Sequence, residues 1–140
     1  MLPKRFAGVF LILLFQIYAD MQQIIKVSFI ATALLLSSCT AFFLPDNSMR
    51  GPDAAWISRK RWDSLSDSEK KSIPHIVPDF IIELQSETDN IKELKLKMTK
   101  WVKNGVKLAW LVSPQSQETL VYFNNKTETI PFNKTLDGKN

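Results

Sequence analysis

The fold of this chain is best predicted from Pro78-Asp79-Phe80-Ile81-Ile82-Glu83-Leu84, an apolar run that holds two acids. β-favouring residues dominate it, so residues 79–85 are expected to form a strand. Side chains alternate along a strand, which puts Asp79 and Glu83 on one face, about 13 Å apart. An acid within an apolar strand is costly to bury without a partner. Glu83 therefore needs a buried partner or a chemical role.

The residues after this strand predict a helix and three more strands. Asp89 is a suitable N-cap for a helix over residues 90–103, and Asn104-Gly105 is a good stop signal. A buried strand is expected at residues 108–112. Residues 120–123 and 128–132 are expected to form a hairpin across Asn124-Asn125. The apolar stripe of the helix consists of Ile91, Leu94, Met98, Trp101 and Val102.

The residues before the strand complete an α/β pattern. Residues 53–58 are predicted to form a strand, and Ser58 is placed to cap a short helix through residue 65. Ser66-Asp67-Ser68-Glu69 is a capping box for a further turn. The order of elements indicates an α/β or α+β sheet in which residues 90–103 form a crossover helix.

Composition limits the classes of function. The chain has 140 residues, 45% of them hydrophobic and 23% charged, which suits one globular domain. A net charge of +4 suits a polyanionic partner without identifying one. The single cysteine, Cys39, excludes an internal disulfide and a four-cysteine zinc site. The single histidine, His75, disfavours a histidine-rich metal site.

The N-terminal residues are strongly apolar and have three interpretations. Residues 6–18 and 27–44 carry no charge, but the first stretch is too short to span a bilayer and the second is borderline. From Met21, the second stretch is similar to a bacterial lipoprotein signal, with Cys39 as the lipidated residue. A buried apolar helix with an inert cysteine is the second interpretation. A misplaced start or shifted reading frame, which would make residues 1–39 foreign to the domain, is the third.

An ordered set of segments resembles the Uma-type family of predicted restriction endonucleases, which belongs to the PD-(D/E)xK nuclease superfamily and is abundant in bacteria. The similarity covers roughly residues 40–132, with residues 133–140 as a tail. It implies a restriction-endonuclease-like mixed sheet with a crossover helix, preceded here by an apolar N-terminal helix. The matching segments are Phe43-Leu44-Pro45-Asp46, Pro52-Asp53-Ala54-Ala55-Trp56-Ile57-Ser58, Pro78-Asp79-Phe80-Ile81-Ile82-Glu83-Leu84, Ser86, Asp89, Leu94, Lys97-Met98, Asn104-Gly105-Val106 and Trp110-Leu111-Val112.

The resemblance also implies a catalytic site. Asp53 and Glu83 would be catalytic metal ligands for Mg2+, with Asp79 as a further candidate ligand. Lys97 would replace the lysine that many relatives keep two residues after the acid, where this chain has Gln85. Helical periodicity puts Lys95 nearer the apolar face and Lys97 on its flank, so either lysine could reach the site.

Each of these residues also has a plain structural interpretation. Asp53 and Asp79 follow prolines, where the carboxylates of turns are ordinary. Without the resemblance, Lys97 would be a solvated residue of a lysine-rich helix. Trp101 and Trp110 are expected in the core.

The implied partner is DNA, and the implied reaction is magnesium-dependent hydrolysis of its phosphodiester bonds in the cytoplasm. Homodimer formation stays open. Family members usually carry a further N-terminal region and continue past the point where this chain ends, so a truncated, inactive remnant is one alternative. A lipoprotein tethered to a membrane through residues 6–44 or Cys39 is the other. The candidate contacts to the DNA backbone are Arg59, Lys60, Arg61 and Lys100.

Overall fold

The structure is a computed structural model, and it describes residues 34–37 and 41–136. The chain divides into two compact units, Met1–Phe29 with Thr135–Asn140, and Ile30–Lys134. The second unit contains every helix and strand of the described residues.

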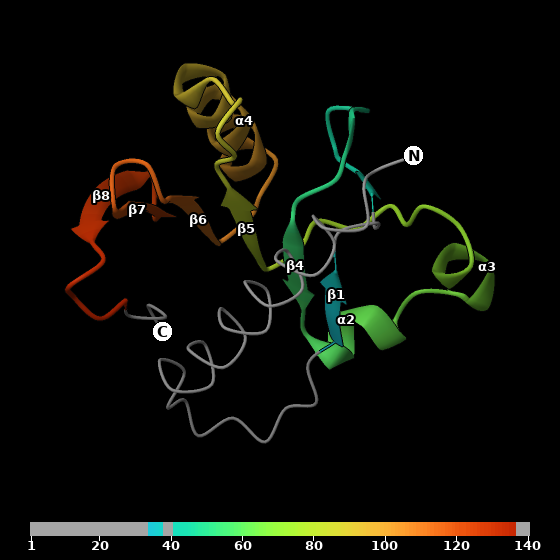
Figure 1. The fold of residues 1–140 in the computed structure, drawn as a ribbon. Helices are drawn as coiled ribbons and strands as arrows, with labels where there is room; N and C mark the ends of the chain where they lie inside the picture. The colour runs from blue at the N-terminus through green and yellow to red at the C-terminus, as the bar shows by residue number, and fades with distance from the viewer. Residues whose placement is uncertain (1–33, 38–40, 137–140) are drawn as a thin grey trace, which may run out of the picture. The chain divides into compact units, whose positions relative to one another are not determined.

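The described residues form a six-stranded mixed sheet in the order β1-β4-β5-β6-β7-β8 (Figure 1). Neighbouring strands are antiparallel except β5 and β6, which are parallel. Parallel neighbours need a crossover connection, and helix α4 (Ile91–Lys103) supplies it. The predicted mixed sheet with a crossover helix is therefore confirmed. The strands are β1 (Leu34–Ser37), β4 (Ala54–Ile57), β5 (Phe80–Leu84), β6 (Leu108–Ser113), β7 (Glu118–Phe123) and β8 (Lys126–Pro131).

Short elements surround β4. Strands β2 (Phe42–Phe43) and β3 (Met49–Arg50) form a small antiparallel pair that the sequence did not predict. Helices α2 (Arg59–Asp63) and α3 (Asp67–Lys70) follow β4. The capping box at the start of α3 is present.

The start of α4 differs from the prediction by one residue. Asn90 is the N-cap, and its side chain accepts a hydrogen bond from the Lys92 N–H at 2.9 Å. Asp89 instead accepts the Ser86 N–H at 2.8 Å, which closes the turn between β5 and the helix. The helix ends as predicted, because Gly105 adopts a φ of +106° that disfavours residues with a side chain.

The β7–β8 hairpin has the predicted turn. Asn124 and Asn125 have φ values of 50° and 59°, and Phe123 pairs with Lys126 across them. A two-residue turn with two positive φ values matches the right-handed twist of the strands, and asparagine tolerates this conformation.

The core that positions the site lies between α4 and the sheet. Met98 and Trp101 of α4 are fully buried against Ile81 of β5 and Leu111 of β6. Trp101 and Trp110 are both buried, as predicted. Residues alternate along β5, so Glu83 lies on the same face as Ile81 and points toward the helix.

The apolar N-terminal stretch was expected to form a helix, and its described part does not. Leu34–Ser37 is a strand that pairs antiparallel with β4 over four residues. The free edge of β4 offers unpaired backbone groups, and β1 satisfies them. Residues 1–33 and 38–40, which include Cys39, lie outside the described residues. Within the described part of the chain, no helix is long and apolar enough to cross a membrane.

Candidate active site

Glu83 is a buried carboxylate, with only 2% of the residue exposed. Lys97 Nζ lies 2.7 Å from its Oε1 and 2.8 Å from its Oε2. The indole N–H of Trp101 donates to Oε1 at 3.0 Å. Both partners come from α4, so the crossover helix satisfies the acid that strand β5 buries.

Lys97 also joins α4 to the loop before β4. Its ammonium donates to the Gly51 carbonyl at 3.2 Å. Lys95 is exposed, so of the two lysines that periodicity left open, Lys97 is the one beside Glu83.

Asp53 lies directly before β4, and its carboxylate reaches across to β5. Its Oδ2 accepts the Leu84 N–H at 2.7 Å. Leu84 follows Glu83, so this hydrogen bond brings the two acids to the same end of β5. The structure therefore assembles Asp53, Glu83 and Lys97 from a loop, a strand and a helix.

The surroundings of Glu83 shift its pKa in opposite directions. Burial raises the pKa of Glu83 above its usual value, although the hydrogen bonds and charge of Lys97 and the Trp101 N–H oppose this rise. The negative charge of Asp53 raises this pKa further. A cation between the two carboxylates would remove that repulsion.

The donor set suits a hard divalent ion with few protein ligands. In the described part of the chain, no group of three or more His, Cys, Asp or Glu side chains is arranged to hold a metal. Asp53 and Glu83 supply oxygen donors, and magnesium usually keeps several waters beside one or two carboxylates. The donor chemistry of the residues present therefore fits a hard divalent ion such as Mg2+.

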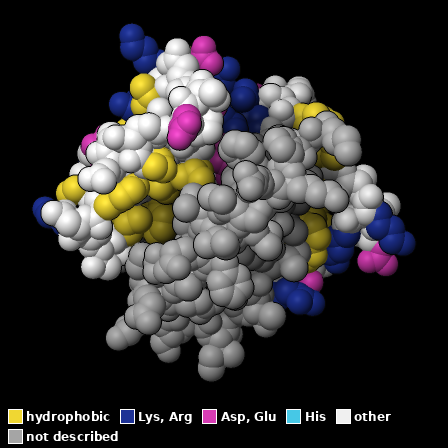
Figure 2. All heavy atoms as spheres, viewed as in Figure 1, with side chains coloured by type: hydrophobic (Ala, Val, Ile, Leu, Met, Phe, Trp, Pro, Cys, Tyr) yellow, Lys and Arg dark blue, Asp and Glu magenta, His cyan; other side chains and the backbone are white. Residues whose placement is uncertain are grey.

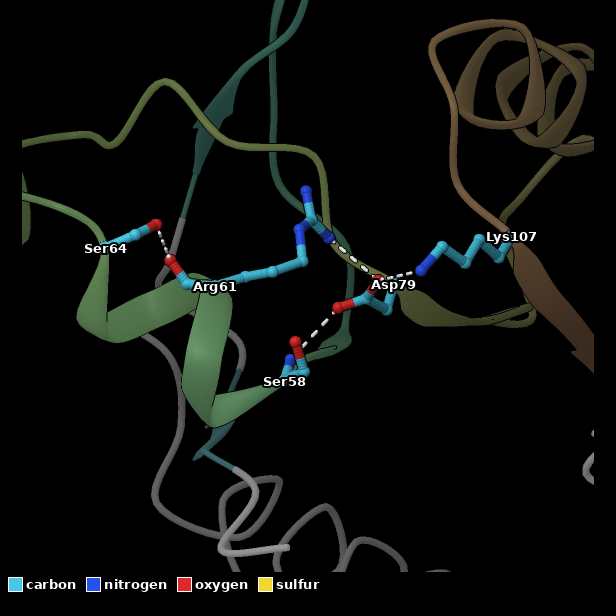
Figure 3. A network of polar contacts seen from close by, with 5 residues as sticks. All are labelled: Ser58, Arg61, Ser64, Asp79 and Lys107. Carbon is cyan, nitrogen blue, oxygen red and sulfur yellow. Dashed lines mark hydrogen bonds and ion pairs between the residues drawn. The ribbon is translucent and has the colours of Figure 1, made fainter.

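Asp79 lies at the other end of β5 in a separate network (Figure 3). Its Oδ1 lies 2.8 Å from Arg61 Nη1 and 2.8 Å from Lys107 Nζ, and its Oδ2 accepts the Ser58 N–H at 3.0 Å. Burial raises the pKa of Asp79, but these partners outweigh it and hold the pKa below its usual value. Asp79 thus links α2, β5 and the start of β6.

The four candidate DNA-contacting residues differ in whether their side chains already form ion pairs within the chain. Arg59 pairs with Asp63 at 2.8 Å and Arg61 pairs with Asp79. Lys60 and Lys100 are exposed, and the side-chain ammonium of neither has a hydrogen bond or ion pair with another described residue. Figure 2 shows the Lys and Arg side chains at several separate places on the visible face.

Two contacts of the site escaped the sequence prediction. Trp101 was assigned to the core alone, although its spacing of four residues from Lys97 puts both on one helix face. The Gly51 carbonyl has no sequence signal. Gln85, where the resemblance implied a lysine in many relatives, accepts a hydrogen bond from the Ser113 hydroxyl at 2.6 Å.

Comparison with known proteins gives a family and a fold. The Uma2 family model, described as "Putative restriction endonuclease", matches residues 16–139. This match extends beyond residues 40–132 on both sides and includes β1. No curated protein sequence matches the chain significantly.

Two of the solved structures that match this one are a protein from Anabaena variabilis and a DNA complex. The first is described as "a putative nuclease belonging to DUF820" from Anabaena variabilis, with 18% identity and a TM-score of 0.61. That similarity covers 79% of this chain and 60% of the other, so this chain spans less than two thirds of that protein. The second is the DrdV–DNA complex, with 10% identity, a TM-score of 0.46 and coverage of 74% of this chain and 8% of the other.

Proposed function

The chain belongs to the Uma2 family, and we propose that it is a metal-dependent endonuclease that hydrolyses DNA phosphodiester bonds. The observation that carries the proposal is the convergence of Asp53, Glu83 and Lys97 at one end of β5. These residues are distant in sequence and come from three different elements.

Asp53 and Glu83 would hold Mg2+. When bound, this ion polarises a phosphate and lowers the pKa of a coordinated water. Asp53 is held in place by the Leu84 N–H through one oxygen, which leaves its Oδ1 without a hydrogen-bond partner among the described residues. Glu83 is held by α4 through both oxygens.

Lys97 would supply positive charge to the reacting phosphate. Two carboxylates alone repel a phosphodiester, and negative charge grows on its oxygens as the water attacks. The Gly51 carbonyl and Glu83 keep the ammonium at this end of β5. Lys97 is partly exposed, with 31% of its side chain accessible, so the ammonium can exchange Glu83 for a phosphate oxygen.

DNA would approach through its backbone. Lys60 and Lys100 are the free cations among the four candidates, and Lys100 lies one helical turn from Lys97. Arg59 and Arg61 are already neutralised by Asp63 and Asp79. Backbone contacts of this kind confer affinity without sequence preference.

Cleavage of supercoiled plasmid by the purified chain, with and without Mg2+, tests the proposal. Asp53→Asn and Glu83→Gln should each lower the cleavage rate at least about 100-fold. Asp63→Asn makes the same carboxylate-to-amide change on α2 and should retain activity. A folded wild-type chain that cuts no DNA with any divalent ion would overturn the proposal and identify an inactive member of the family.

A further inference from the structure

Trp101 makes a polar contact that its position in the core does not require. The residue is fully buried, and its Nε1–H donates to Glu83 Oε1 at 3.0 Å. The indole has one hydrogen-bond donor and no acceptor, so this hydrogen bond satisfies the only polar group of the side chain. The contact is directed at the acid that is the proposed metal ligand.

Trp110 provides the comparison within the same core. It is also buried, at 3% exposure, and its Nε1 has no hydrogen-bond partner among the described residues. The two tryptophans differ in what lies beside the indole nitrogen. This fold thus buries one tryptophan without a polar partner, while the other points its N–H at Glu83.

Lys97 and Trp101 hold Glu83 in different ways. Lys97 has a long, flexible stem, is partly exposed and carries a charge that repels a metal cation. Trp101 is rigid, packed against the sheet and neutral. A cation can therefore replace the contact of Lys97 with Glu83 while the contact of Trp101 persists.

We infer that Trp101 is a positioning residue for the metal ligand Glu83: its indole N–H fixes the carboxylate in the orientation that receives a divalent cation. This inference rests on the proposed function, because it assigns Trp101 to the same site. Partners of this kind orient a metal ligand, and their removal typically lowers metal affinity about 10- to 100-fold.

A titration of the full chain with Mn2+ tests the inference without DNA. Electron paramagnetic resonance measures the concentration of the free ion. Trp101→Phe should weaken Mn2+ binding about 10-fold. Trp110→Phe is the matched control, since it also replaces a buried indole by a phenyl ring, and it should leave the dissociation constant within about twofold of wild type. Thermal unfolding of both variants separates metal affinity from stability.

The outcomes separate the inference from the proposed function. Wild-type binding that Glu83→Gln abolishes and Trp101→Phe leaves unchanged would overturn the role of Trp101 alone. A wild-type chain that binds no Mn2+ would overturn both ideas. If Trp101→Phe does not fold, benzothienylalanine at position 101 replaces the N–H by sulfur with nearly the same shape, and the same weakening is expected.

Discussion

The ammonium of Lys97 lies within 2.8 Å of both carboxylate oxygens of Glu83, although the two residues belong to different elements. The crossover helix brings them together by returning across the sheet between β5 and β6. The ion pair has a consequence for metal binding. A cation that binds Glu83 must compete with an ammonium that already neutralises it.

Replacing Lys97 tests how much this pair stabilises the fold. Lys97→Met leaves Glu83 buried with the Trp101 N–H as its remaining partner, and the free energy of unfolding should fall by about 1–3 kcal/mol. The raised pKa of Glu83 limits the loss, because the acid can take up a proton. Urea unfolding measures the change. Lys95→Met on the exposed face should cost less than about 0.5 kcal/mol, and equal losses for the two variants would contradict the assigned pair.

Lys100 should contribute one phosphate contact. Lys100→Gln is expected to reduce the slope of log affinity against log salt concentration by about 0.9 for duplex DNA. Fluorescence anisotropy over a salt series measures the slope, and a Glu83→Gln background prevents cleavage. Lys126→Gln removes the same charge at the β7–β8 turn and should leave the slope unchanged. A slope that responds to both lysines equally would mean that DNA does not bind along α4.

The network around Asp79 should make stability depend on pH. Its partners hold the pKa of Asp79 below the unfolded value of about 3.9, so its stabilisation is present above that pH and is lost as pH falls through the folded pKa. Asp79→Asn should lower the free energy of unfolding by about 1–3 kcal/mol at pH 7, and this loss should shrink below about pH 4.

The control for Asp79 is an exposed ion pair. Asp63 pairs with Arg59 on the surface of α2, and Asp63→Asn should change stability by less than about 1 kcal/mol at neutral pH. Chemical unfolding across the pH range compares the two. If Asp79→Asn lowers the free energy of unfolding by the same amount at every pH, the network stabilises the fold through packing and not through the charge of Asp79.

The stability contributed by the β7–β8 turn should depend on the backbone conformation that the residue at position 125 can adopt. Asn125 has a φ of 59°, which glycine adopts freely and a β-branched residue does not. Asn125→Val should cost about 1–2 kcal/mol, whereas Asn125→Gly should be neutral or stabilising by about 0.5 kcal/mol. Thermal unfolding distinguishes them. Asn133→Val changes an exposed asparagine without a positive φ, and a similar loss there would contradict the conformational explanation.

Local pattern was sufficient for most of the elements. Strand β5, helix α4 and the β7–β8 hairpin were predictable because alternation, an apolar stripe and the Asn124-Asn125 turn act between near neighbours. The cap of α4 was placed one residue early, since both Asp89 and Asn90 suit that position and the Ser86 turn uses Asp89. Strand β1 was missed because its residues lie in an uncharged apolar stretch that was expected to form a helix, and because its pairing with β4 is distant in sequence.

The residue pattern by itself determined a sheet with a crossover helix and an acid that had to find a partner inside it, and the family resemblance added that the sheet is mixed. The residue pattern did not determine which lysine would meet Glu83, or that an indole N–H would join it. Those choices depend on how α4 is rotated against the sheet. That rotation is fixed where Met98 and Trp101 pack against the sheet. Helical periodicity placed both residues in the apolar stripe but left Lys95 and Lys97 as alternatives beside it.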